Sequence, residues 1–287
     1  MQKGGKKRPL RKPQSQNRPG LESKMKPVPV ATTSQQGSGK LQGKVAFITG
    51  GDSGIGRAVA VLFAKEGAKL AIAYLSEHRD AEETQKLIEA ENGECLLIPG
   101  DLSKEINCRR AVSKAVKKFG KIDILINNAA VHYEQKKLED ITTEQLLKTF
   151  ATNFYSYFWI TKAALPDIPE GGCIINTSSV TAYRGSPSLI DYASTKGAIV
   201  SFTRSLASNL VKRKIRVNGV APGPVWTPLI ASTFKPEKVS DFGSDAPMAR
   251  AGEPAEIAPG YLFLASEDGS YITGQFIHPN GGEIVNG

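Results

Sequence analysis

The chain is 287 residues long, 40% hydrophobic, and carries a formal net charge of +9 at pH 7. No apolar run reaches the roughly 18 residues that a membrane-spanning helix requires, and none near the start resembles a signal peptide. The three cysteines, at positions 95, 108 and 173, form no Cys-x-x-Cys pair and have no histidine at metal-ligand spacing. We therefore expect a cytoplasmic protein without a structural metal and without a membrane partner.

Almost all of the net charge lies in the first 40 residues, which contain ten Lys or Arg and a single acidic residue, Glu22. The rest of the chain is neutral as a group, with 27 basic and 27 acidic side chains. Prolines at five positions, with Gln, Ser and Gly between them, predict that residues 1–40 are disordered or extended. The basic run at residues 6–12 is compatible with nucleic acid, a nuclear signal or an anionic membrane. We favour a solvated arm that lies over a neighbouring subunit, and expect no nucleic-acid partner.

Residues 41–287 alternate apolar runs with segments of helical periodicity. Strands are predicted at residues 44–49, 69–74, 95–98, 122–126, 173–177, 215–220 and 275–278, and helices at 57–66, 79–92, 104–119, 143–165, 191–213 and 254–264. Strands separated in this way by helices require right-handed crossovers and a parallel sheet covered on both faces. The predicted fold class is α/β, a doubly wound parallel seven-stranded sheet (Rossmann fold) in a single domain. Residues 228–247 are predicted to be an irregular insertion that covers a substrate.

A glycine-rich turn follows the first predicted strand. Gly50, Gly54 and Gly56 stand in the spacing Gly-x-x-x-Gly-x-Gly, directly before the first predicted helix. Without Cβ atoms the backbone can approach a pyrophosphate closely, and the helix N-terminus beyond offers unpaired N–H groups and a partial positive charge. The turn is therefore predicted to bind a diphosphate, and a plain glycine-rich turn is the alternative.

A hydroxyl, a phenol and an ammonium at suitable offsets indicate a site of proton transfer. Ser179 follows a predicted strand, and Tyr192 and Lys196 are one turn apart on a predicted helix. An ammonium beneath the phenol would lower the pKa of Tyr192 from its ordinary value of about 10. Tyr133 and Lys137 share this spacing, but no hydroxyl precedes them at the matching distance and their surroundings are typical of a solvated turn. An amphipathic helix with one aromatic residue and one long lysine is the alternative for the first pair.

Taken together and in this order, the motifs resemble those of the short-chain dehydrogenase/reductase family over residues 41–287. The motifs that carry the resemblance are residues 49–56 (Thr-Gly-Gly-Asp-Ser-Gly-Ile-Gly), Asp101-Leu102, Asn127-Asn128-Ala129-Ala130, Asn153, Ser179, Tyr192, Lys196 and residues 222–227. The chain is most similar to the subgroup labelled glucose/ribitol-dehydrogenase-like, whose members carry a polar N-terminal extension resembling residues 19–25. Ala130 departs from the family, which usually has glycine there, and we expect the extra methyl to be tolerated.

The resemblance implies a role for each of four catalytic residues. Tyr192 would exchange a proton with the substrate oxygen while hydride passes between the substrate carbon and a nicotinamide, and Ser179 would hold that oxygen. Lys196 would contact the nicotinamide ribose, and Asn153 would help a water chain reach Lys196. The implied cofactor-binding residues are Gly50, Asp52, Ser53, Gly54, Ile55, Gly56, Tyr74, Asp101, Leu102, Asn128, Ala129, Tyr192, Lys196, Pro222, Gly223, Val225 and Thr227.

The function that the resemblance implies is that of an NAD(P)-dependent oxidoreductase. Its substrate would be the CH–OH or C=O group of a small alcohol, polyol, sugar or aldehyde, and its assembly a homotetramer. The alternative is a nucleotide-binding redox sensor or regulatory protein that uses the basic tail on nucleic acid. The intact Ser179, Tyr192 and Lys196 favour the enzyme, because a sensor would be free to lose them.

The end of the second predicted strand bears on the choice between NAD and NADP. NAD enzymes commonly place an acid there to accept hydrogen bonds from the ribose hydroxyls, whereas this chain has Tyr74. Ser76, Arg57 and Arg79 would offer hydroxyls and positive charge to a 2′-phosphate, which favours NADP. NAD stays the alternative, because Glu77 is close enough in sequence to reach the ribose.

Overall fold

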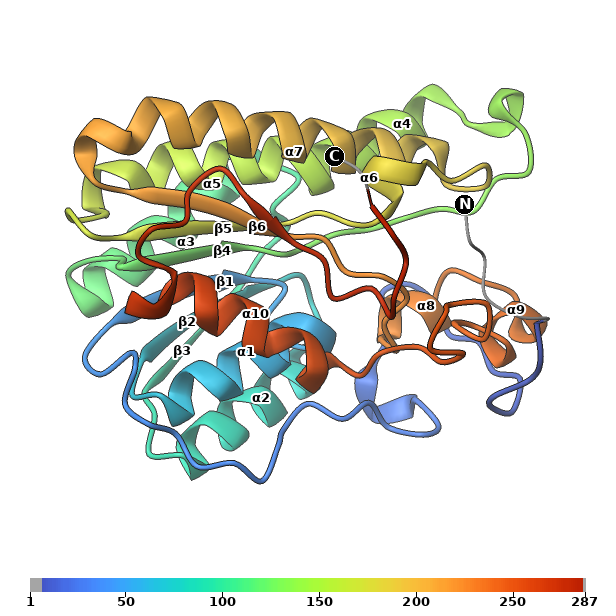
Figure 1. The fold of residues 1–287 in the computed structure, drawn as a ribbon, viewed down its shortest axis with the longest axis horizontal. Helices are drawn as coiled ribbons and strands as arrows, with labels where there is room; N and C mark the ends of the chain where they lie inside the picture. Colours follow the sequence, from blue (N-terminus) through green and yellow to red (C-terminus); the bar gives the residue numbers. More distant parts are fainter. Residues whose placement is uncertain (1–6, 286–287) are drawn as a thin grey trace.

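The computed structural model describes residues 7–285, so Lys3 and Lys6 of the basic tail lie outside the described residues. Figure 1 shows a layered α/β domain in which a central sheet lies between two layers of helices. The sheet has seven parallel strands in the order β3-β2-β1-β4-β5-β6-β7, which confirms the predicted fold class. The strands are β1 (Val45–Thr49), β2 (Lys69–Tyr74), β3 (Cys95–Pro99), β4 (Ile124–Asn127), β5 (Cys173–Thr177), β6 (Arg216–Val220) and β7 (Phe276–Ile277).

Helices cover both faces of the sheet (Figure 1). One face carries α1 (Gly54–Lys65), α2 (His78–Ala90) and α10 (Pro254–Ala265), and the other carries α3 (Glu105–Phe119), α4 (Thr143–Phe150), α5 (Ser156–Ala164) and α7 (Ile190–Leu210). Three shorter helices are α6 (Thr181–Arg184), α8 (Pro228–Ala231) and α9 (Pro236–Ser240). Single turns of 3₁₀-helix lie at Glu22–Lys24, Leu138–Asp140, Leu165–Asp167, Val211–Arg213 and Glu267–Gly269.

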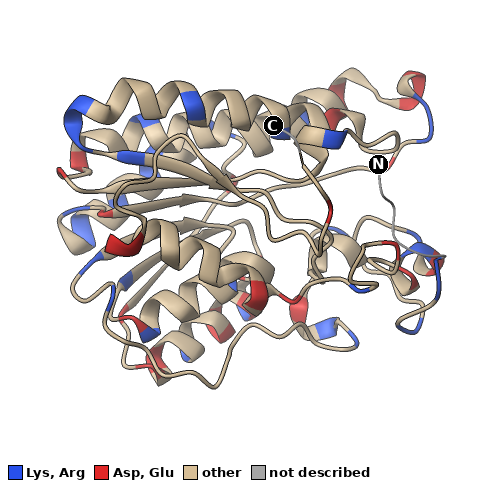
Figure 2. Ribbon diagram, viewed as in Figure 1, with Lys and Arg blue, Asp and Glu red and all other residues tan. Residues whose placement is uncertain are grey.

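The central strands are apolar because helices cover them on both sides. Every residue of β1, β4 and β5 is buried, and Figure 2 shows no charged residue on these strands. β1 pairs with β2 on one side and with β4 on the other, so the chain returns to the middle of the sheet after β3. At such a reversal of strand order, an open α/β sheet has a crevice beyond the carboxyl ends of its strands, where ligands bind.

Two segments differ from the predictions. The prediction that residues 228–247 are irregular is wrong, because α8 and α9 form there around the buried side chains of Phe234 and Val239. The helix predicted at residues 143–165 is present, but five residues, Ala151–Tyr155, form a π-helical turn between α4 and α5. Turns of this kind are rare and often occur at functional sites.

Residues 7–40 run in an extended path over the surface of the same chain. The backbone N–H groups of Leu10 and Arg11 donate to the carbonyl of Ser240, at 2.7 and 3.1 Å, and so join this segment to α9. Met25 is 1% exposed and packs with Trp226 in a small apolar cluster around α8 and α9. We call residues 7–40 the extension and residues 228–247 the lid; the extension holds the lid against the domain.

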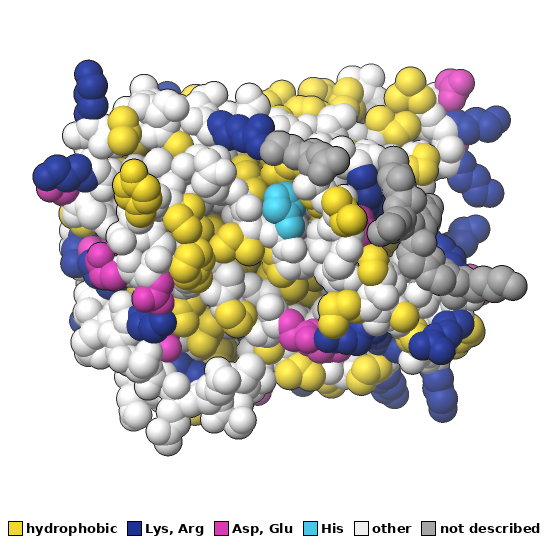
Figure 3. Space-filling view, viewed as in Figure 1, with side chains coloured by type: hydrophobic (Ala, Val, Ile, Leu, Met, Phe, Trp, Pro, Cys, Tyr) yellow, Lys and Arg dark blue, Asp and Glu magenta, His cyan; other side chains and the backbone are white. Residues whose placement is uncertain are grey.

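A row of large apolar side chains stays exposed on α4, on α5 and in the π-helical turn between them. Leu147 is 56% exposed, Phe158 46% and Tyr155 39%. Figure 3 shows hydrophobic side chains along the upper edge of the molecule, where α4, α5 and α7 lie. An apolar patch of this kind is typical of a surface that another protein covers.

Within residues 7–285, no helix is both long enough and apolar enough to cross a membrane. The same residues contain no cluster of His, Cys, Asp and Glu side chains that could hold a metal ion. All three cysteines are free thiols.

Candidate active site

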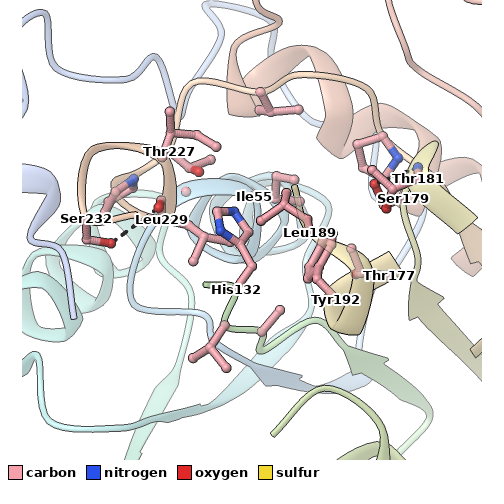
Figure 4. Close-up of a pocket in the computed structure, with 18 of the residues that line it drawn as sticks. Ile55, His132, Thr177, Ser179, Thr181, Leu189, Tyr192, Thr227, Leu229 and Ser232 are labelled. Atoms are coloured by element: carbon pink, nitrogen blue, oxygen red, sulfur yellow. Dashed lines mark hydrogen bonds between the residues drawn. The ribbon is translucent and has the colours of Figure 1, made fainter. Parts of the chain in front are cut away.

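A cavity of about 790 Å³ opens beyond the carboxyl ends of the central strands. Its walls come from the glycine turn, the loops after β4, β5 and β6, the lid and the extension, and Figure 4 shows part of this lining. The predicted site residues that line it are Gly50, Asp52, Ser53, Gly54, Ile55, Tyr74, Asp101, Leu102, Asn128, Ala129, Ser179, Tyr192, Lys196, Pro222, Gly223, Val225 and Thr227. Gly56 and Asn153 are not in the lining, although both pack directly behind it.

The glycines of the turn are required by close backbone approaches. A Cβ atom on Gly56 would lie 2.0 Å from the carbonyl oxygen of Gly50, closer than real Cβ contacts come. Gly50 has a φ of +64° and Gly54 a φ of +54°, a conformation that favours glycine. The turn therefore exposes bare backbone to the cavity at the positive end of α1, which fits the diphosphate of a dinucleotide.

Asn128 and Thr49 fasten the glycine turn to the end of β4. The side-chain amide of Asn128 donates to the carbonyl oxygens of Thr49 and Gly50, each at 3.1 Å. The Thr49 hydroxyl accepts from the backbone N–H groups of Asn128 and Ala129, at 2.8 and 3.1 Å. These bonds fix the floor of the cavity, and Ala130 lies in its lining, so the departure from glycine does not close the site.

Arg57 is engaged elsewhere and is not part of the cavity wall. Its guanidinium donates to the carboxylate of Glu22 at 2.6 Å, to the hydroxyl of Thr84 at 2.9 Å, and to the carbonyl oxygens of Asp52 and Asp80, each at 2.8 Å. The side chain is buried and all its donors face these partners. The expectation that Arg57 meets a 2′-phosphate is therefore wrong.

The glycine turn and the region after β2 present carboxyl groups rather than cations to the cavity. Glu77 and Asp52 are both buried in its lining, and the carboxylate of Glu77 accepts from the hydroxyl of Ser76 at 2.9 Å. Burial, and then the nearby charge of Glu77, raises the pKa of Asp52 to about 7. Arg79 is exposed and lies outside the lining. A 2′-phosphate would meet negative rather than positive charge here.

Tyr192 and Lys196 lie one turn apart on α7, as predicted. The Lys196 ammonium nitrogen is 5.5 Å from the centre of the Tyr192 ring and donates to the carbonyl of Thr177 at 2.8 Å. Burial raises the pKa of Tyr192 to about 12, although a hydrogen bond with the Ser179 hydroxyl counters this, and burial lowers the pKa of Lys196 to about 7. In the protein alone, burial therefore outweighs the expected effect of Lys196 on the phenol.

Asn153 sits in the π-helical turn and connects two loops of the site. Its amide oxygen accepts from the backbone N–H of Val131 at 2.8 Å, and its amide nitrogen donates to the carbonyl of Val131 at 2.9 Å. The same nitrogen donates to the hydroxyl of Thr195 at 3.2 Å. The extra residue of the π turn places this amide between the loop after β4 and α7, the helix that carries Tyr192 and Lys196.

The sequence did not point to His132 or Arg18, which both line the cavity together with Phe234 of the segment expected to cover the substrate. His132 lies beyond β4, and placement after a strand is the one signal that could have singled it out. Arg18 comes from the extension and stacks over the ring of Tyr133 at 4.5 Å, a contact between distant segments that no local pattern predicts.

Comparisons with known proteins agree with this site. Residues 50–283 match the sequence model of the family described as Enoyl-(Acyl carrier protein) reductase. The chain is 52% identical over 276 residues to the NADPH-dependent aldehyde reductase 1, chloroplastic, of Arabidopsis thaliana, covering 93% of this chain and 96% of that protein. It is 51% identical over 283 residues to the glucose and ribitol dehydrogenase of Daucus carota, covering 96% of this chain and 97% of that protein.

Among solved structures, a short-chain dehydrogenase from Burkholderia cenocepacia J2315 in complex with NADP is similar, with a TM-score of 0.80 and 31% identity. The match covers 85% of this chain and 98% of that one. Fold, site geometry and sequence thus agree. The chain belongs to the short-chain dehydrogenase/reductase family, as an NAD(P)-dependent oxidoreductase that acts on CH–OH groups.

Proposed function

We propose that this enzyme reduces the carbonyl group of a small aldehyde or sugar to an alcohol or polyol, and catalyses the reverse oxidation, with Tyr192 as the acid/base. The observation that carries the proposal is the convergence of Ser179, Tyr192 and Lys196 on the same cavity that the glycine turn enters. A bound nicotinamide supplies the hydride acceptor or donor. Tyr192 gives a proton to the substrate oxygen in reduction and removes it in oxidation, and the Ser179 hydroxyl holds that oxygen.

Lys196 completes this arrangement through its charge. Its ammonium donates to the carbonyl of Thr177, close to the phenol, and is buried away from water. A positive charge there favours the phenolate form of Tyr192. Groups of a bound cofactor that hydrogen-bond the ammonium would keep Lys196 protonated and so make the phenol a better acid/base. Asn153 hydrogen-bonds both the loop after β4 and α7, and so holds these two walls of the site at a fixed distance from each other.

The substrate class follows from the lid and from the relatives. Phe234 and Phe242 from the lid stack 6.0 Å apart and close the cavity with an apolar wall. Such a wall shields the reacting carbonyl from water. The relatives named as an aldehyde reductase and as a glucose and ribitol dehydrogenase support an aldehyde, sugar or polyol as substrate.

We infer that NAD is the preferred cofactor, in place of the NADP that the sequence favours. Two buried carboxyl groups line the cavity, on Asp52 of the glycine turn and on Glu77 after β2, while Arg57 is neutralised by Glu22 and Arg79 lies outside. Negative charge at the ribose repels a 2′-phosphate. The aldehyde reductase named above uses NADPH, so the two cofactors must be compared directly.

We also propose a homotetramer in the cytoplasm. The exposed apolar side chains of α4 and α5 suit a helix pair buried between subunits, and the three free thiols suit a reducing compartment. The extension packs on its own chain, with Arg11 stacked over Trp226 at 4.1 Å.

A steady-state screen of aldehydes, ketones, sugars and polyols with each nicotinamide cofactor tests the proposed function. We expect turnover of at least one short aldehyde and of the corresponding alcohol in the reverse direction. Tight binding of a dinucleotide without turnover of any carbonyl or alcohol would contradict the proposal and favour the sensor.

A further inference from the structure

His132 is a buried imidazole that faces the catalytic tyrosine inside the cavity. It is 3% exposed and is the only histidine among the described residues of the lining. Its ring lies edge-to-face against Tyr192, with ring centres 5.1 Å apart, and tilted by 36° against Phe234 of the lid, with centres 5.4 Å apart. Figure 4 shows the imidazole directed into the cavity between Leu229 and Tyr192.

Hydrogen bonds hold the backbone that carries this ring. The carbonyl of His132 accepts from the hydroxyl of Thr233 in the lid at 3.2 Å. Its neighbour Val131 is bound through both backbone groups to Asn153. The backbone therefore holds the imidazole in place beside the phenol, as a group that selects a substrate requires.

The ring carries one buried polar atom that the described residues leave without a partner. Its Nδ1 atom is buried and has no hydrogen-bond partner among residues 7–285. Burial, helped by the positive charges of Arg18, Lys196 and Lys238, lowers the pKa of His132 to about 3, so the ring is neutral and has one donor and one acceptor. An unpartnered buried polar atom is costly, and a ligand that pairs with it recovers this cost.

We propose that His132 is a specificity-determining residue, which hydrogen-bonds an oxygen on the substrate carbon next to the one that reacts at Tyr192. This inference rests on the proposed function and narrows it. When the reacting oxygen is held at the phenol, the oxygen on the adjacent carbon lies on the side where the imidazole meets the tyrosine. Hydroxyaldehydes, sugars and polyols have this second oxygen, and plain aliphatic aldehydes do not.

The test compares two aldehydes of the same chain length, glyceraldehyde and propanal, through kcat/KM. The wild type should prefer glyceraldehyde. His132→Phe keeps a ring against Tyr192 and Phe234 but removes both nitrogens, so it should lose about tenfold on glyceraldehyde, the worth of one neutral hydrogen bond. Its kcat/KM for propanal should stay within about twofold of wild type, because propanal makes no such bond.

Two further variants separate recognition from packing. His132→Gln retains a donor and an acceptor and should restore part of the preference for glyceraldehyde. His278→Phe is the control, because His278 stacks on Tyr183, 4.7 Å away between ring centres, and lies outside the cavity lining. It should change neither aldehyde.

Equal losses of His132→Phe on both aldehydes, or no loss on either, would overturn the inference and leave the proposed function standing. A wild type with equal kcat/KM for propanal and glyceraldehyde would also overturn the inference and leave the proposed function standing. A wild type that turns over neither these aldehydes nor any other carbonyl would overturn the proposed function, and the inference with it.

Discussion

At the scale of single residues, the site contains buried ionisable groups that lower the stability of the fold. Lys196 is 1% exposed and its ammonium has one hydrogen-bond partner in the described chain, the carbonyl of Thr177. Asp52 and Glu77 are buried beside each other at the other end of the cavity. Buried charges without full partners destabilise a fold, and ionisable groups held in this way inside one cavity are typical of functional sites.

Lys196→Met should abolish turnover and stabilise the protein. Burial lowers the pKa of Lys196 from 10.5 to about 7, so between these values the unfolded chain holds a proton that the folded chain lacks. Wild-type stability therefore rises with pH across that window and is lowest below pH 7. At pH 6 the variant should melt higher by about 2–4 °C, which corresponds to about 1 kcal/mol, and this advantage should shrink toward pH 10.

Thermal unfolding at several pH values measures this effect. Lys114→Met is the control, because Lys114 is exposed on α3, and it should leave the melting temperature and its pH dependence unchanged. A Lys196→Met protein that melts lower than wild type at pH 6 would contradict the idea that the ammonium is held at a cost.

Glu77→Gln should shift cofactor preference toward NADPH. It removes the charge of one of the two carboxyl groups that line this part of the cavity, and with it part of the repulsion of a 2′-phosphate. We expect the wild type to favour NADH by more than about tenfold in kcat/KM, a difference of 1.4 kcal/mol, and the variant to reduce that ratio. Glu83→Gln, at an exposed position of α2, is the control. Wild-type preference for NADPH would show that NAD is the wrong choice.

At the scale of secondary-structure elements, the extension contacts the glycine turn and helps to hold it in place. Glu22, in its 3₁₀ turn, is 1% exposed and accepts from the backbone N–H of Gly54 at 2.5 Å as well as from Arg57 at 2.6 Å. Asp80 of α2 in turn accepts from the backbone N–H of Glu22 at 2.6 Å. A residue outside the Rossmann domain thus holds the N-terminus of α1 in place.

Glu22→Ala should lower both stability and cofactor affinity. The change leaves the buried guanidinium of Arg57 without its nearest carboxylate, and breaking a buried pair in this way costs about 3 kcal/mol. Melting curves and fluorescence titration with NADH measure the two effects. Ser23→Ala changes the exposed neighbour in the same turn and should alter neither the melting temperature nor the affinity for NADH. An unchanged melting temperature for Glu22→Ala would refute this role of the extension.

The sheet and most helices could be predicted from the sequence because their signals are local. Apolar runs such as Cys173–Thr177 coincide with strands, and Ser179, Tyr192 and Lys196 stand at offsets that the strand and helix bring together. The π turn at Ala151–Tyr155 could not be predicted, because one extra residue in a turn leaves no periodic trace. The helices of the lid, the path of the extension and the pairing of Arg57 depend on contacts between distant segments, which local patterns do not contain.

At the scale of the whole molecule, α4 and α5 present apolar side chains that a monomer would leave in water. Light scattering at micromolar concentration should show a tetramer, and Phe158→Lys should shift it to smaller species, because Phe158 is 46% exposed in the single chain and a charge there would be buried by association. Lys162→Ala on the same helix is the control. A stable wild-type monomer would contradict the proposed assembly.

The central claim is that Tyr192 transfers the proton, and Tyr192→Phe tests it most directly. The variant deletes only the phenolic hydroxyl, so NADH should bind as it does to the wild type while turnover falls by about 10²–10⁴-fold, the usual worth of general acid–base catalysis. Tyr133→Phe is the matched control, since it keeps the ring over which Arg18 stacks and should change little. Activity of Tyr192→Phe within about threefold of wild type would contradict the account.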